Sequence, residues 1–151
     1  MSSLLETYAK VAGQDVVNQL RQLAGLLEGC RVVHVNSTRE GGGVAEILTK
    51  LVPLMEELGI QTSWEVITGN EDFYRCTKGF HNALQGSRID VPDKLLKVYE
   101  ETNRRTAGEL ADILGDADVV FIHDPQPAPL LGNIPQRKGK WIWRCHIDLS
   151  Q

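Results

Sequence analysis

The sequence predicts an α/β protein built on an open, mostly parallel β-sheet with helices on both sides. Short, β-branched segments alternate along the chain with longer segments in which apolar residues recur every three or four positions. The short segments are apolar on both faces, as strands are when helices cover both sides of a sheet. A length of 151 residues suits one domain of this kind.

The composition excludes several classes of protein. With 42% hydrophobic and 24% charged residues, the chain is neither disordered nor collagen-like. A net charge of −4 lacks the basic surface that nucleic-acid binding requires. The first residues have no secretion-signal pattern, and no apolar run approaches the roughly 20 residues that cross a bilayer. We therefore expect a cytoplasmic protein with neither a nucleic-acid nor a membrane partner.

Residues 1–30 are expected to form a helical leader. From Asp15 onward, apolar residues recur at spacings of four, three and four, which predicts an amphipathic helix ended by Gly29. The expected buried face consists of Val16, Leu20, Leu23 and Leu27.

Four strands and three further helices are expected in the rest of the chain. The strands are residues 31–36, 60–67, 118–123 and 140–145, and the helices are residues 44–58, 73–84 and 95–113. Three prolines between residues 125 and 129 enforce a non-helical loop before the last strand.

Polar residues gather where the predicted strands end. In parallel sheets of this type, ligands bind outside the carboxyl ends of the strands. Those ends carry Asn36-Ser37-Thr38, Thr68-Gly69, His123-Asp124 and His146-Ile147-Asp148. We expect a binding site at this edge of the sheet.

Gly41, Gly42 and Gly43 lie between a predicted strand and a predicted helix. Free backbone N–H groups and the positive helix end favour an anion there, so the three glycines are candidate phosphate-binding residues. The alternative is a plain tight turn, because the segment matches neither the dinucleotide-binding nor the Walker pattern.

Two further positions have competing interpretations. His123 and Asp124 combine a group that titrates near neutrality with a carboxylate able to accept a bond from a sugar hydroxyl, or Asp124 simply begins a turn before Pro125. Arg144 lies on a strand expected to be covered on both faces, so it needs either a carboxylate partner or an anionic ligand such as a phosphate. The four histidines show no metal-ligand spacing, and no metal site is expected.

Six segments in order resemble the amino-terminal domain of the trehalose glycosyltransferring synthases. They are residues 35–48, 51–54, 64–67, 80–86, 123–129 and 141–150. The resemblance implies a Rossmann-like domain of a retaining GT-B glycosyltransferase that makes trehalose from nucleoside-diphosphate glucose and glucose. Retaining trehalose phosphorylases share several of these segments and are the alternative.

The resemblance also implies roles for individual residues. Asp124, which would hold the hydroxyls of the acceptor glucose, and His146, which would meet the donor glucose, are the candidate catalytic residues. The acceptor pocket would be formed by His81, Asn82, His123 and Gln126. The glycine loop, Gly41 to Gly43, would lie against the donor diphosphate. No tightly bound cofactor is implied, and dependence on a divalent metal stays open.

In a GT-B enzyme, the nucleotide and its diphosphate are bound mainly by a second, carboxy-terminal domain. We therefore expect residues 31–151 to be an incomplete acceptor-side domain of a longer enzyme, inactive by itself. Expected partners are the sugars, the sugar nucleotide and the missing domain, and a homo-oligomer with a second copy of the chain is a further option. A free-standing half, or a non-catalytic module that binds a sugar or a sugar nucleotide, is the other interpretation.

Overall fold

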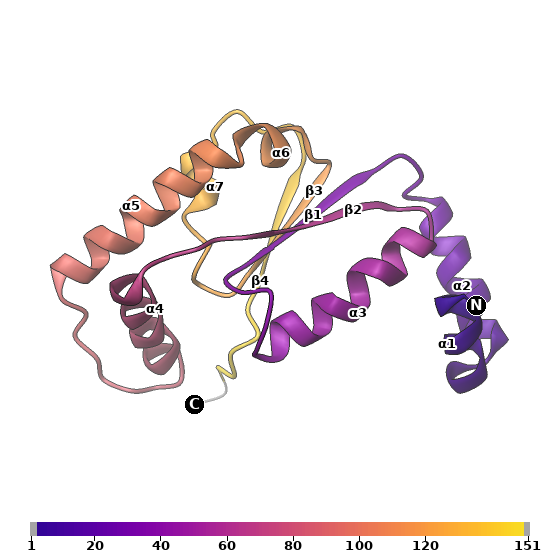
Figure 1. Cartoon of the computed structure of the whole chain (residues 1–151), viewed down its shortest axis with the longest axis horizontal. Helices are drawn as coiled ribbons and strands as arrows, with labels where there is room; N and C mark the ends of the chain where they lie inside the picture. The colour runs from indigo at the N-terminus through magenta and orange to yellow at the C-terminus, as the bar shows by residue number, and fades with distance from the viewer. Residues whose placement is uncertain (1–2, 150–151) are drawn as a thin grey trace.

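The computed structural model describes residues 3–149 and contains one sheet of four parallel strands (Figure 1). Its order is β2-β1-β3-β4, with bounds β1 Arg31–Asn36, β2 Gln61–Val66, β3 Val119–His123 and β4 Lys140–Arg144. Since each neighbouring pair is parallel, the carboxyl ends of all four strands lie at one edge. The predicted fold class is confirmed.

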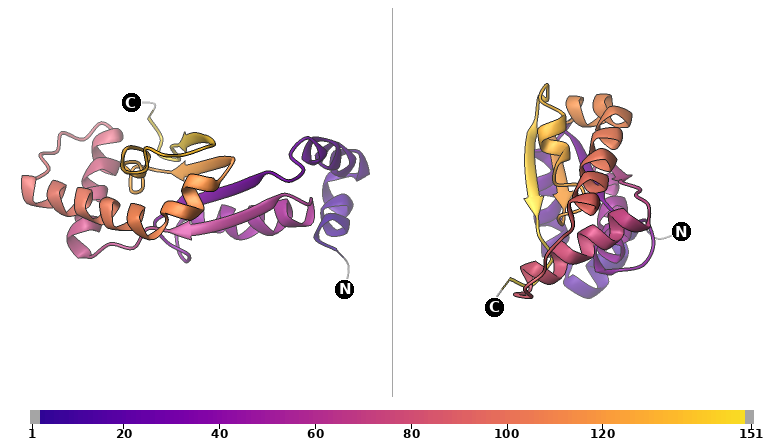
Figure 2. Two further views of the ribbon diagram at one scale, coloured as in Figure 1. Left: turned by 90° about the horizontal axis from the view of Figure 1, so that it is seen from above. Right: turned by 90° about the vertical axis from the view of Figure 1, so that its left-hand side faces the viewer.

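Helices lie on both faces of the sheet and extend beyond its ends. They are α1 Leu4–Ala12, α2 Gln14–Gly25, α3 Gly43–Glu57, α4 Glu71–Leu84, α5 Asp93–Glu109, α6 Ala111–Asp116 and α7 Leu130–Asn133. Figure 2 shows that α1 and α2 lie at one end of an elongated molecule, whereas α4 and α5 lie at the other.

Alternating side chains of the strands pack into two cores. Val33 and Val35 of β1 face a core with α5, α6 and α7, whereas Val32 faces a smaller core with α2 and α3. This alternation follows from the two-residue period of a strand. His34 lies on the Val32 side, where its ring stacks on that of Phe121 with 4.9 Å between centroids.

The leader helix buries a different face from the one predicted. Val17 and Ala24 are buried, whereas Val16 and Leu23 are exposed. Ala24 of this helix joins the small core. The apolar period correctly indicated a helix, but it did not identify the residues that are buried in this chain.

Three other details differ from expectation. The helix predicted over residues 95–113 is divided at Leu110, whose φ of −107° and ψ of 8° leave the helical region, into α5 and α6. Helix α7 was not predicted. Strand β4 is an exposed edge strand rather than one covered on both faces, with Ile142 and Trp143 42% and 51% exposed.

Substitution of Gly139, just before β4, is expected to cause a large loss of stability. A Cβ there would overlap the backbone carbonyl oxygens of Ala117 and Asp118. The Asp118 oxygen also accepts the N–H bond of Lys140 that begins β4. We expect Gly139→Ala to lower the free energy of unfolding by about 2 kcal/mol, a typical cost of overpacking.

Urea unfolding of the chain measures this loss. Gly132→Ala in α7 is the matched control, because a Cβ at Gly132 meets no atom within 4 Å. Equal stability of the two variants would contradict the prediction.

Candidate functional site

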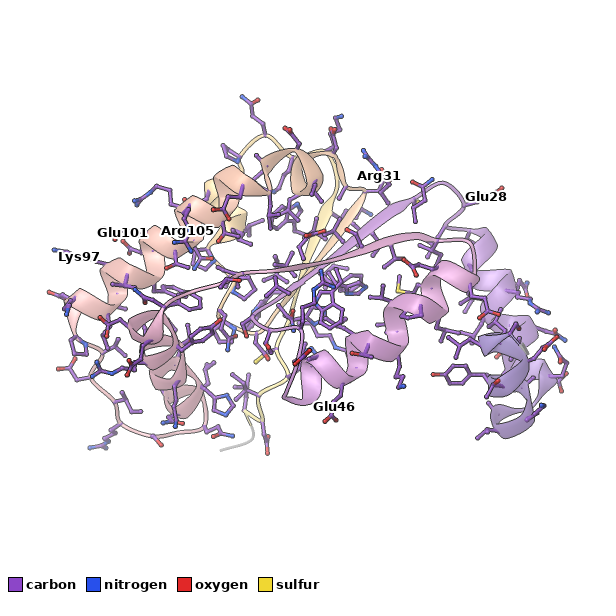
Figure 3. The ribbon with its side chains drawn as sticks, in the orientation of Figure 1. Glu28, Arg31, Glu46, Lys97, Glu101 and Arg105 are labelled. Atoms are coloured by element: carbon purple, nitrogen blue, oxygen red, sulfur yellow. The ribbon has the colours of Figure 1, made fainter. Side chains whose placement is uncertain are left out.

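The predicted polar residues converge at the carboxyl edge of the sheet. Figure 1 shows that the start of α3, helix α4 and the carboxy-terminal segment lie around this end of the strands. Arg31, labelled in Figure 3, begins β1 at the opposite, amino edge, where its guanidinium donates to the Asp116 carbonyl oxygen at 2.7 Å. Two hollows mark the carboxyl edge.

The first hollow joins the glycine loop to the end of β3. Its volume is about 160 Å³, and it is lined by Asn36, Ser37, Thr38, Gly41, Gly42, Gly43, Val44, Ala45, His123 and Asp124. The structure thus brings the three candidate phosphate-binding glycines next to two of the candidate sugar-binding residues. The φ angles of Gly41 and Gly42, 74° and 84°, turn the chain into α3.

Alanine substitutions in the glycine loop distinguish two effects on stability, the cost of a positive φ and the space available for a side chain. At Gly42 a side chain fits but the positive φ disfavours it, so Gly42→Ala is expected to cost about 1 kcal/mol of stability. Gly43 begins α3 without a positive φ, so Gly43→Ala is expected to be neutral or stabilising by up to roughly 1 kcal/mol. Thermal unfolding of both variants checks this, and a Gly42→Ala variant as stable as Gly43→Ala would contradict it.

The second hollow lies over α4. Its volume is about 380 Å³, and it is lined by Tyr74, Thr77, Lys78, His81, Asn82 and Gln126. Three of the four residues expected in the acceptor pocket therefore meet here, although Gln126 is more than forty positions from the other two. The Oε1 atom of Gln126 is buried without a partner among the described residues.

The loop that carries Gln126 is held by α5. Tyr99 donates its hydroxyl to the Pro125 carbonyl oxygen at 2.6 Å, and the Asn103 amide donates to that of Gln126 at 3.1 Å. Burial raises the pKa of Tyr99, so its hydroxyl stays protonated and keeps donating. These bonds position the loop after β3 independently of any ligand.

Asp124 has an unusual backbone and a structural bond of its own. Its φ is 62°, the one positive φ of a residue other than glycine between residues 3 and 149. Carboxylate Oδ1 accepts the backbone N–H of His146 at 2.7 Å, and the Asp124 N–H donates to the Arg144 carbonyl oxygen at 3.0 Å. Oδ1 thus holds the segment after β4 in place, whereas the second carboxylate oxygen takes no part in this bond.

His123 is buried between two other histidines. Its Nε2 lies 3.0 Å from Nδ1 of His34, and its Nδ1 lies 2.9 Å from Nε2 of His146. Burial is the main cause that lowers the pKa of His123 to about 3, aided by the neighbouring histidines and the positive charge of Arg144. With both ring nitrogens engaged, His123 shapes the first hollow without a free hydrogen-bonding atom on its ring.

Arg144 and His146 line neither hollow. Arg144 is exposed on β4. The prediction that Arg144 is buried and therefore needs a partner is wrong. No ion pair between the described residues involves it. Its role as a phosphate-binding residue stays a prediction. His146 is partly buried and joins the site through His123 and Asp124.

Sequence reasoning missed two residues of this edge, His34 and Tyr74, and it included a third, Asn36, only as part of a polar strand end. His34 is a histidine in the middle of an apolar strand, and that position was the available signal. Asn36 accepts the Trp64 indole N–H at 2.7 Å and donates to the Thr38 carbonyl oxygen at 2.8 Å. Tyr74 donates its hydroxyl to the Ser37 carbonyl oxygen at 3.2 Å, linking α4 to the glycine loop. Nothing in the sequence singled out Tyr74.

Two features are absent from residues 3–149. No group of three or more His, Cys, Asp or Glu side chains is placed to hold a metal ion. No helix in this range combines the length and the apolar character needed to cross a membrane. The last residue of the sixth resembling segment, Ser150, lies outside the described residues.

Fold and site together define a Rossmann-like α/β domain whose polar edge lies at the carboxyl ends of its parallel strands, beside a glycine-rich turn. Comparison with known families is more specific. Residues 34–151 match the family described as "Trehalose synthase, N-terminal domain", and the chain belongs to this family.

Individual relatives agree with the family. The chain is 46% identical to the trehalose synthase of Rubrobacter xylanophilus and 46% identical to that of Thermococcus litoralis. Each match covers 97% of this chain but only 36% and 35% of the relative, so the chain spans about a third of the length of these proteins. A trehalose phosphorylase of Pleurotus pulmonarius is 31% identical over 96% of the chain and 21% of its own length.

Proposed function

We propose that this chain is the acceptor-side part of a glycosyltransferase that makes trehalose from nucleoside-diphosphate glucose and glucose. The observation that carries the proposal is the convergence at one sheet edge of the glycine loop with Asp124, and of His81 and Asn82 with Gln126. Family membership favours trehalose as the product.

The two hollows suit different parts of such a reaction. Backbone N–H groups of the glycine loop and the amino end of α3 suit the donor diphosphate, because both favour an anion. The side chains over α4 can donate and accept hydrogen bonds, as the hydroxyls of a glucose acceptor require. The free oxygen of Asp124 would accept a bond from one of those hydroxyls.

We assign these residues to positioning rather than to a nucleophile-and-base pair. Holding acceptor and donor in the reacting geometry is itself a large part of catalysis. The residues that bind the nucleotide are proposed to lie outside this chain, which is therefore expected to be inactive alone. Its carboxyl edge would form one wall of the complete active site.

The direction of the reaction is tested on the full-length protein that contains this chain. It is incubated with several nucleoside-diphosphate glucoses plus glucose, and separately with trehalose plus phosphate. We expect trehalose in the first assay and no glucose phosphate in the second. Phosphorolysis of trehalose would instead establish the phosphorylase activity named for the more distant relatives. Absence of both reactions would overturn the proposal.

A further inference from the structure

A chain of three histidines leads from the interior of the sheet to its carboxyl edge. His34 lies on β1, His123 ends β3 and His146 follows β4, so the rings come from three neighbouring strands. Their nitrogens are 3.0 and 2.9 Å apart. We propose that His34 is a positioning residue. Through its hydrogen bond to His123, it determines which ring nitrogen of His146 carries the proton.

The two inner rings are neutral near neutral pH. Burial is the main cause that lowers the pKa of His34 to about 4 and that of His123 to about 3, and Arg144 contributes in both cases. A neutral imidazole has one N–H donor and one acceptor nitrogen. The bonds therefore run in one of two directions: His34 and His123 donate outward from Nδ1, or His146 and His123 donate inward from Nε2.

The inner end of the chain decides between these directions. Nε2 of His34 is buried and has no partner among residues 3–149. An inward direction would leave an N–H group unpaired there, whereas an outward direction leaves only a lone pair. Unpaired N–H groups are the rarer of the two in protein interiors. Stacking on Phe121 holds the His34 ring in place, so the outward direction is favoured.

An outward direction makes Nδ1 of His146 a hydrogen-bond donor at the site. Between residues 3 and 149 no group pairs with this nitrogen, while the His146 backbone is fixed by the bond to Asp124. An N–H at this place suits an oxygen atom of a bound sugar, and this last step rests on the proposed function. Because the chain ends at an unpartnered buried nitrogen, it orients a proton and has no route to carry one away.

The direction is measured in the full-length protein labelled with ¹⁵N-histidine, at pH 7 and without substrate. Long-range ¹H–¹⁵N spectra distinguish an imidazole protonated at Nδ1 from one protonated at Nε2. We expect all three rings to carry their proton on Nδ1. A wild-type spectrum with His146 protonated at Nε2, or with a mixture of tautomers, would overturn the proposal. The outcome is independent of whether the protein makes trehalose.

The role of His34 is tested with His34→Asp, whose carboxylate can accept an N–H from Nε2 of His123 but cannot donate to it. We expect the direction of the bonds to reverse, so that His146 carries its proton on Nε2. Phe121→Leu is the matched control, because it removes the stacked ring and leaves the histidine bonds, and it should retain the wild-type pattern. His34→Asn, whose amide N–H can replace that of Nδ1, should restore much of it.

A pure Nδ1 tautomer of His146 in folded His34→Asp would overturn the positioning role. If that variant fails to fold, the His34→Asn and wild-type spectra still decide the direction of the chain.

Discussion

Replacement of Asp124 by alanine is expected to lower transfer to glucose by about 100-fold in the full-length protein, the scale seen when one positioned polar group is removed from an active site. The carboxylate oxygen proposed to hold the acceptor is lost. So is the oxygen that accepts the His146 N–H at 2.7 Å. Binding of the sugar nucleotide, measured by calorimetry, should fall less than transfer does, because the nucleotide itself is proposed to be held outside this chain.

Asp124→Asn separates the chemical from the structural role. Asparagine tolerates the positive φ of 62°, and its amide oxygen can still accept the His146 N–H. We expect this variant to unfold at nearly the wild-type temperature yet to transfer glucose more slowly than wild type. Wild-type transfer by Asp124→Asn would remove the carboxylate charge from the mechanism. Wild-type transfer by Asp124→Ala would remove the residue from the site.

The buried histidines predict that the chain loses stability as the pH falls. Their pKa values are about 4 for His34 and about 3 for His123 in the folded state, against 6.5 when unfolded. Between these values the unfolded chain binds protons that the folded chain does not. Above pH 6.5 the two histidines therefore do not reduce the free energy of unfolding. Below pH 6.5 this free energy falls by up to about 1.4 kcal/mol per pH unit for each histidine.

Urea unfolding of the chain at pH 7, 6 and 5 measures this slope. In His34→Phe one of the two titrating groups is absent, so its stability should fall about half as steeply below pH 6. Phe121→Leu should be less stable at every pH but keep the wild-type slope. Measurements go no lower than pH 5, because the lowered carboxyl pKa values of Glu57 and Asp116 also affect the stability of more acidic samples. Identical slopes in wild type and His34→Phe would contradict the assignment.

Periodicity was sufficient for most of the elements because each depends on its own local pattern. The apolar spacing after Gly43 predicted α3 to within a residue or two, and the β-branched run before Asn36 predicted β1. Local pattern failed where burial depends on distant parts of the chain. Leu23 has the spacing of a buried residue but is 59% exposed. Strand β4 is apolar in composition, yet it is the outermost strand of the sheet and has a neighbouring strand on one side only.

The candidate site was predictable in its location and only partly in its internal geometry. Polar residues at strand ends indicated the edge, because parallel strands bring those ends together. The link from His34 through His123 to His146 was not predictable, since the three residues are more than twenty positions apart from one another. Ligand spacing along the sequence says nothing about neighbours across a sheet.

The sequence by itself determined the fold class, the polar edge and, through six ordered segments, the family. These follow from local hydrophobic periods and from motif order, which need no coordinates. Only the tertiary structure decided that His123 has no free ring nitrogen, that one carboxylate oxygen of Asp124 accepts the His146 N–H, and that Arg144 is exposed. Each of these depends on strand order and register, which place residues distant in sequence within hydrogen-bonding distance of one another.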